Sequence, residues 1–209
     1  MSDSPLDGLP APRRADVMAA VSAVETAEQP VPGNAFRALA EAPMRHVVEQ
    51  VLAVSGRVLL RSGSGYLSGY DDAIVARFIE EGIGVLPRED RAVLSLVVLF
   101  AVAIPRAERT IPTEAPWSRG EPVLRERLKD SRLPDNVIDG ALRRLRDARI
   151  ISSGPRGISP GPQFDRLTAA ASARIFEELV LLAEPSGSLA ERIRRRRLAH
   201  AVGSGGSGV

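Results

Sequence analysis

The sequence predicts a mainly helical protein with a small β component, and three observations carry this prediction. Apolar residues recur at three- and four-residue steps in several separate segments, as they do along one face of an α-helix. Two short apolar stretches, 58–70 and 150–158, instead surround glycine-containing turns, which is typical of β-hairpins. The 209 residues are 44% hydrophobic, which is enough for one good core and a second small one.

The composition excludes several kinds of site and segment. A chain without cysteine has no disulfide, no thiolate metal site and no cysteine nucleophile. The longest apolar run, 92–104, is shorter than the roughly 20 residues that a membrane-spanning helix needs. Residues 1–12 lack the basic and apolar regions of a secretory signal. We therefore expect a cytoplasmic protein that does not contact a membrane.

Charge is distributed unevenly along the chain. Residues 1–100 hold nine Arg and 13 acidic residues, a net charge of −4, whereas residues 101–209 hold 19 basic and 13 acidic residues, a net charge of +6. A basic C-terminal half suits a polyanionic partner such as nucleic acid, and it equally suits a solvated surface. All cations except Lys129 are Arg, a bias that indicates a GC-rich bacterial genome.

The first predicted region, residues 1–33, is a mostly disordered tail. Three prolines, a glycine and scattered acids in residues 1–12 leave little to bury. A short helix over 15–28, ended by Pro30 and Pro32, is expected to dock only weakly.

Residues 34–86 are predicted to form a small helical module. Asn34 is a suitable N-cap for an amphipathic helix or helix pair that reaches Leu52, with Pro43 as a break or kink. A short strand pair around the glycines of 62–65 follows, and then a helix that Asp71 or Asp72 caps and Gly82 ends.

Residues 87–163 carry the clearest pattern. A helix over 89–103 is apolar nearly all round, which predicts burial on most faces, and Pro105 is expected to stop it. A polar linker leads to a short helix beginning at Pro122, a turn over 131–134 and a third helix over 134–149. Ile150 and Ile151 then enter a hairpin whose tip is 153–157 and whose return begins at Ile158.

The chain is predicted to close with a long helix and a basic tail. Residues 164–184 have an apolar stripe that either completes the core or forms a dimer seam. Residues 185–209 contain a short helix with the basic run Arg194, Arg195, Arg196 and Arg197, followed by a flexible Gly/Ser segment, either native or an added linker.

The apolar and turn positions of the third segment resemble the winged helix-turn-helix of many bacterial regulators. The matching positions are Leu124, Leu128, Ser131, Leu133, Val137, Ala141, Leu142, Leu145, Ala148, Ile150 and Ile151. The resemblance covers about residues 89–162 and concerns packing positions, which do not specify a ligand. The same core is used in kite subunits of bacterial SMC complexes, similar to MukE and ScpB, where it largely serves protein contacts.

The resemblance implies a DNA-reading surface, because the third helix of such a motif enters the major groove. Asn136 and Arg143 suit adenine and guanine, and Arg144 and Arg146 suit phosphates or ion pairs on the helix itself. Arg156 at the hairpin tip is placed to reach the minor groove. The basic run 194–197 adds cations that could contact phosphate, an acidic protein surface or neither.

Acidic residues on the same helix favour the alternative function, in which the motif contacts protein. Asp135 and Asp139 would meet the phosphate field, unless they only complement the helix dipole. The sequence therefore predicts either a DNA-binding winged-helix protein, dimeric in the manner of regulators, or an architectural kite-like subunit of an SMC or defence complex. The two histidines lie apart without ligand partners, so we expect no metal, no cofactor and no catalysis.

Overall fold

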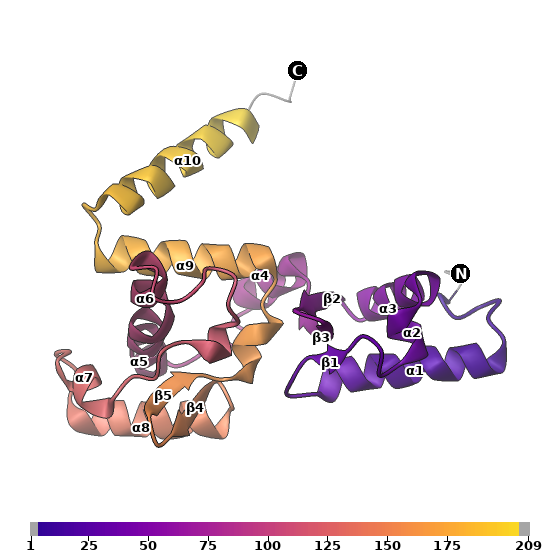
Figure 1. Ribbon diagram of the computed structural model, residues 1–209. Coiled ribbons are helices and arrows are strands. Elements are labelled where there is room, and N and C mark those ends of the chain that lie inside the picture. Colours follow the sequence, from indigo (N-terminus) through magenta and orange to yellow (C-terminus); the bar gives the residue numbers. More distant parts are fainter. Residues whose placement is uncertain (1–3, 205–209) are drawn as a thin grey trace.

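The computed structural model describes residues 4–204, with side chains through Ala199, and it confirms a mainly helical protein with a small β component. The chain forms two units joined by helix α4 (Asp72–Glu80), and helices α9 (Ala169–Ala183) and α10 (Ser188–Ser204) follow the second unit (Figure 1). Expectations for residues 1–3 and 205–209 lie outside the described residues.

The first unit contains three helices and a three-stranded antiparallel sheet. Its elements, in order, are α1 (Ala11–Thr26), β1 (Val31–Pro32), α2 (Arg37–Ala40), α3 (Ala42–Val54), β2 (Arg57–Ser62) and β3 (Gly65–Tyr70). The strands lie in the order β1–β3–β2, with β2 and β3 joined by a two-residue turn. Pro43 stands at the start of α3, so it separates α2 from α3 and does not kink a single helix.

The expectation of a mostly disordered tail over 1–33 is wrong for the described part of it. Helix α1 buries Val17, Ala20, Val21 and Val24 against α3 and the sheet, and three of these side chains are 0% exposed. The helix is docked tightly because its valines and alanines pack against apolar side chains of later elements, such as Val48 and Leu52 of α3. The first unit therefore begins at α1, and not at Asn34.

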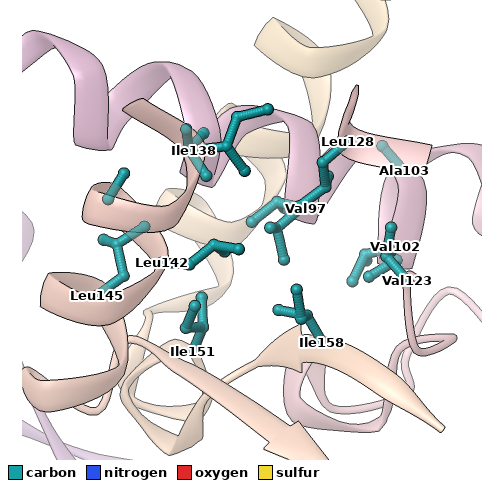
Figure 2. Packing of buried hydrophobic residues seen from close by; sticks show 14 of the residues in the cluster. Val97, Val102, Ala103, Val123, Leu128, Ile138, Leu142, Leu145, Ile151 and Ile158 are labelled. Atoms are coloured by element: carbon teal, nitrogen blue, oxygen red, sulfur yellow. The ribbon is translucent and has the colours of Figure 1, made fainter. Parts of the chain in front are cut away.

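The second unit begins with a long helix made of α5 (Arg88–Val98), a π-helical turn (Leu99–Ala103) and α6 (Ile104–Ala107). A 3₁₀ turn (Trp117–Arg119) precedes α7 (Arg125–Lys129), α8 (Asp135–Asp147), and the hairpin of β4 (Ile151–Gly154) and β5 (Gly157–Pro160). Their apolar side chains converge on one core, to which Val97, Leu128, Ile138, Leu145 and Ile158 contribute (Figure 2).

The two units have the same order of elements. In the second unit Val123 forms an antiparallel bridge with Ile158, so the extended segments lie in the order Val123–β5–β4. This is the order β1–β3–β2 of the first unit, and each unit runs helix, strand, helix, helix, strand, strand. A pair of helices followed by a hairpin, here called the wing of each unit, thus occurs twice, over 11–70 and over 88–160.

Pro105 does not stop the long helix, contrary to the sequence-based expectation. A proline lacks the N–H that would bond to the carbonyl four residues earlier, here that of Ala101. The Ala101 carbonyl accepts instead from the backbone N–H of Glu121 at 2.8 Å, and the π-helical turn precedes the proline. Gly120 allows this approach, because a Cβ there would lie 2.6 Å from the Ala101 oxygen.

The short helix α7 starts at Arg125 and not at Pro122. Val123 exchanges two backbone hydrogen bonds with Ile158, of 2.7 and 2.8 Å, and is held in an extended conformation. This tertiary pairing outweighs the helix-start signal of Pro122.

The C-terminal region differs from the expected flexible tail over 185–209. Helix α10 packs Ala190 and Ile193 against Val180 and Phe176 of α9, and Ala190 is 0% exposed. Helix α9 itself begins after Thr168, which caps it, and places Leu179 in the core of the second unit. A role of α9 in closing the core is therefore confirmed. No helix among residues 4–204 is long and apolar enough to cross a membrane.

Arg166 fastens the second unit to the first. Its guanidinium donates to the carbonyl oxygens of Val24, Glu25 and Ala27 at the end of α1, and to that of Ser68 in β3, at 2.6–3.2 Å. These α1 carbonyls have no partner within the helix. Burial lowers the pKa of Arg166. One side chain thus caps a helix and fixes the contact between the units.

Candidate interaction surface

Helix α8 and the hairpin β4–β5 form the surface on which the sequence places DNA contacts. Asn136 and Arg143 are seven residues apart on α8, so they lie on one face, and both are exposed. Arg156 is exposed in the two-residue turn between β4 and β5. None of these three side chains takes part in a side-chain hydrogen bond or ion pair within residues 4–199, which leaves their polar groups available to a ligand.

The acidic residues of α8 are neutralised by helix α7. Arg125 donates two hydrogen bonds to the Asp139 carboxylate, of 2.8 and 2.6 Å, and Lys129 lies 3.0 Å from Asp135. The hydrogen bond to Asp139 raises the pKa of Arg125. The two carboxylates therefore hold α7 against α8. The sequence analysis predicted for them only a helix-dipole or a phosphate effect. The spacing of Arg125 and Lys129, four residues apart on the preceding helix, was the signal that could have indicated these ion pairs.

Arg144 is held by an intramolecular partner, although its side chain is 45% exposed. Its guanidinium donates to both oxygens of Asp90, at 3.0 and 3.1 Å from Nε, and the Asp90 side chain is only 3% exposed. The hydrogen bond to Asp90 raises the pKa of Arg144. The pair joins the first turn of α5 to α8. Its assignment as a DNA contact is therefore a prediction that the observed geometry disfavours.

Replacing Arg144 with alanine should destabilise the second unit, because Asp90 would remain buried without its charged partner. We expect the melting temperature to fall by several degrees, whereas Arg143→Ala on the exposed face should change it by less than about two degrees. Thermal unfolding followed by circular dichroism measures both variants. Equal melting temperatures would show that the Asp90 pair contributes nothing.

Two further arginines of this region also have intramolecular partners. Arg146 donates to the Ser153 hydroxyl at 3.1 Å and so links α8 to β4. Arg149, with a left-handed φ of 55° just after α8, pairs with Glu28 of the first unit. Arg146 remains exposed and can still contact a phosphate, but Arg149 contributes to the contact between the units.

The basic run of α10 is largely engaged with α9. Arg196 and Arg197 both pair with Glu177, and Arg197 also lies 2.8 Å from Glu178. Arg195 approaches Glu191 of the same helix at 3.8 Å, and Arg194 is exposed without a described partner among residues 4–199. Helix α10 leaves α9 on the side of the molecule away from α8, so the predicted cations do not form one surface (Figure 1).

The first unit offers a different surface at the corresponding helix, α3. Its exposed side chains include His46, Glu49 and Gln50, with His46 3.4 Å from the Glu49 carboxylate and 3.2 Å from the Gln50 amide. The cation of this helix, Arg45, is half-buried over the ring of Tyr66 and donates to the Leu39 carbonyl. This face is unsuited to phosphates. Among residues 4–199, no three His, Asp or Glu side chains gather closely enough to hold a metal ion.

Comparison with known proteins does not extend this description. No known protein family matches the sequence. No curated protein is significantly similar to it. Among solved structures, the chain is similar to the crystal structure of a conserved hypothetical protein from Chlorobium tepidum, with 15% identity over 72% of this chain and 91% of the other. The TM-score of 0.31 is too low to indicate a shared fold or function.

Proposed function

We propose that this protein is a cytoplasmic, non-catalytic architectural subunit that works through protein contacts of its two winged-helix units, in the manner of the kite subunits that residues 89–162 resemble. The proposal rests on how the charged residues of α3 and α8, the two candidate DNA-contacting helices, are paired. Helix α3 exposes Glu49 beside His46, and α8 neutralises Asp135 and Asp139 with cations of α7. Helix α3 therefore contributes little Coulombic attraction for a polyanion, and the surface of α8 contributes only that of Arg143, Arg146 and Arg156.

Two winged-helix units in one chain also suit a subunit that bridges partners. Arg166 and the Arg149–Glu28 pair hold the units in one relative position. A fixed spacing between two docking faces lets one rigid subunit contact two segments of a partner or two partners at once, which raises the effective concentration of the second contact.

Co-expression with the products of the adjacent genes tests this proposal, and an SMC-like ATPase and a kleisin are the expected neighbours. The full chain should elute with them as a stoichiometric complex after nuclease treatment and at about 0.5 M salt, where exposed charge pairs are screened. If neither kind of gene is adjacent, or if the purified products elute separately from the chain, the architectural proposal is wrong.

Duplex DNA is the second candidate ligand, and a specific observation favours it. Asn136 and Arg143 share one exposed face of α8, and Arg156 is exposed on the neighbouring hairpin. These side chains could contact DNA weakly through its backbone while the other surfaces contact protein. A homodimer would double such contacts.

Arg143→Ala and Arg156→Ala should each weaken binding of a short duplex at low salt, and each should reduce the steepness of the salt dependence by about one phosphate contact. Arg174→Ala on the exposed part of α9 is the matched control and should change neither property. Fluorescence anisotropy across a salt series measures all three variants. Tight duplex binding by the isolated chain at physiological salt, lost in both variants, would favour a DNA-binding protein over the architectural subunit.

A further inference from the structure

A hollow lies between α9, α10 and α6, with a volume of about 570 Å³. Its apolar lining comes from Phe176, Leu189 and Ile193, and its polar lining includes Arg106, Arg192 and Arg196. A second hollow of about 810 Å³ lies between the wing of the first unit and the loop 113–119. The two hollows share four lining residues, Arg106, Thr113, Ala169 and Ser172, so they meet in one groove.

Arg106 stands where the two hollows meet and is unusual among the arginines of this chain. Its side chain is buried, with the residue only 8% exposed, and its guanidinium lies 4.8 Å from the centre of the Trp117 ring. Nη2 donates to the Ala115 carbonyl at 2.6 Å, but Nε has no acceptor within the described residues. Burial lowers the pKa of Arg106, and the charge of Glu114 offsets part of this effect, but no carboxylate among those residues lies within 4.0 Å of the guanidinium.

The comparison with Arg166 shows what Arg106 lacks. Burial lowers the pKa of both arginines, yet Arg166 donates to four carbonyl oxygens and the Ser68 hydroxyl, whereas Arg106 has one carbonyl. Buried charges in proteins are ordinarily paired or fully hydrogen-bonded, because an uncompensated buried charge is costly. Arg106 therefore has the environment of a group that is completed by an anion from outside the chain.

The charges around the groove favour the same kind of ligand. Arg192 and Arg196 of α10 line its rim on the side of the first hollow, where the one carboxylate, Glu177, already contacts Arg196 and Arg197. On the side of the second hollow, Asp165 accepts hydrogen bonds from Ser118, and Glu114 also lines the wall. An entering carboxylate would therefore meet cations on two sides. The apolar floor from Phe176, Leu189 and Ile193 requires that the carboxylate be carried by a ligand that also has apolar groups.

We propose that this groove docks a segment of a partner protein in which an Asp or Glu side chain is flanked by apolar residues, with the carboxylate directed to Arg106 and Arg192. The proposal rests on the architectural function above and names the docking site for its partner. The groove continues from α10 to the wing of the first unit, a length that suits a polypeptide segment and exceeds what a single small anion would fill.

The isolated full chain allows a test that does not depend on the natural partner. Two short synthetic peptides of Leu and Ala are compared, one with central Glu residues and the other with Gln at the same positions, both with blocked ends. Trp117 is the sole tryptophan and lines the groove beside Arg106, so its fluorescence reports occupancy. We expect the Glu peptide to bind at least about tenfold more tightly than the Gln peptide.

Variants identify the residues responsible. Arg106→Gln should abolish the preference for the Glu peptide, and Arg192→Glu, at the exposed rim, should reverse it. Arg174→Gln, also exposed on α9, is the matched control and should leave the preference unchanged. Circular dichroism establishes that Arg106→Gln is folded, and Arg192→Glu tests the site without altering a buried residue.

The outcomes separate this inference from the proposed function. Equal affinity for the two peptides, or a preference that survives in both Arg106→Gln and Arg192→Glu, overturns the groove as a carboxylate site. A complex with the adjacent gene products that forms equally well with these variants also overturns it, while supporting the architectural function. Peptide discrimination without any such complex overturns the function and leaves the groove as a peptide site.

Discussion

Trp117→Ala should destabilise the protein by about 3–5 kcal/mol, the range for removing a large buried aromatic side chain. Trp117 is 4% exposed, stacks on Phe164 with ring centroids 5.6 Å apart, and donates its indole N–H to the Ser172 hydroxyl at 2.6 Å. It thereby joins the 3₁₀ turn after the long helix to α9. The sequence predicts a polar linker here, whereas the structure buries Trp117 of this segment in the core of the second unit.

Trp117→Phe is the matched control, because it retains an aromatic ring but removes the N–H group. Its expected cost is about 1–2 kcal/mol, from the lost hydrogen bond and the smaller ring. Urea unfolding followed by far-ultraviolet circular dichroism measures both variants without the tryptophan signal. If alanine were no more destabilising than phenylalanine, the packing role of Trp117 would be refuted.

Arg166→Ala should lower the free energy of unfolding by about 2–4 kcal/mol, because it removes charge-assisted hydrogen bonds and leaves carbonyls at the end of α1 without a donor. The contact between the units should loosen as well, since the hydrogen bonds of the Arg166 side chain to α1 and β3 are lost. Small-angle scattering should then show a larger radius of gyration. Urea unfolding gives the change in stability.

Arg166→Lys tests whether charge or geometry matters at this position. A lysine keeps the charge, but its single nitrogen cannot reach four carbonyls as the planar guanidinium does. We expect a loss of stability close to that of the alanine variant. Gly69→Ala is an independent probe, because a Cβ there would lie 2.7 Å from the Leu60 Cδ1 atom and would press on the Arg166 backbone. Unchanged scattering in both Arg166→Ala and Gly69→Ala would mean that other contacts hold the units together.

Local periodicity was sufficient to predict most of the second unit. Ile138, Ala141, Leu142 and Leu145 recur at helical steps, and all four are buried on one face of α8. The glycines at 154 and 157 mark the hairpin that forms there. These features depend on neighbours within a few residues along the chain, and a sequence displays such neighbours directly.

The repeated arrangement in the first unit was not recognised, for a physical reason. Helix α1 is rich in alanine and has no strong apolar stripe, and β1 is a two-residue strand that exists only through pairing of Val31 with Tyr66 and Pro32 with Gly65. Neither element has a strong local signal. The sequence predicts a short helix over 15–28, but the burial of α1 and the pairing of β1 depend on residues that lie far away in sequence, so only the folded chain reveals them.

The sequence by itself determined the fold class, the two helices and following hairpin of the second unit, and the chemical types of the candidate contact residues. Only the tertiary structure decided which arginines have partners: Arg144 on Asp90, Arg166 on the end of α1, and Arg196 and Arg197 on Glu177. The reason is that ion pairs and buried hydrogen bonds join residues separated by 19 to 142 positions. The periodicity of a sequence indicates on which face of a helix a side chain lies, but it does not indicate which residues of other elements pack against that face.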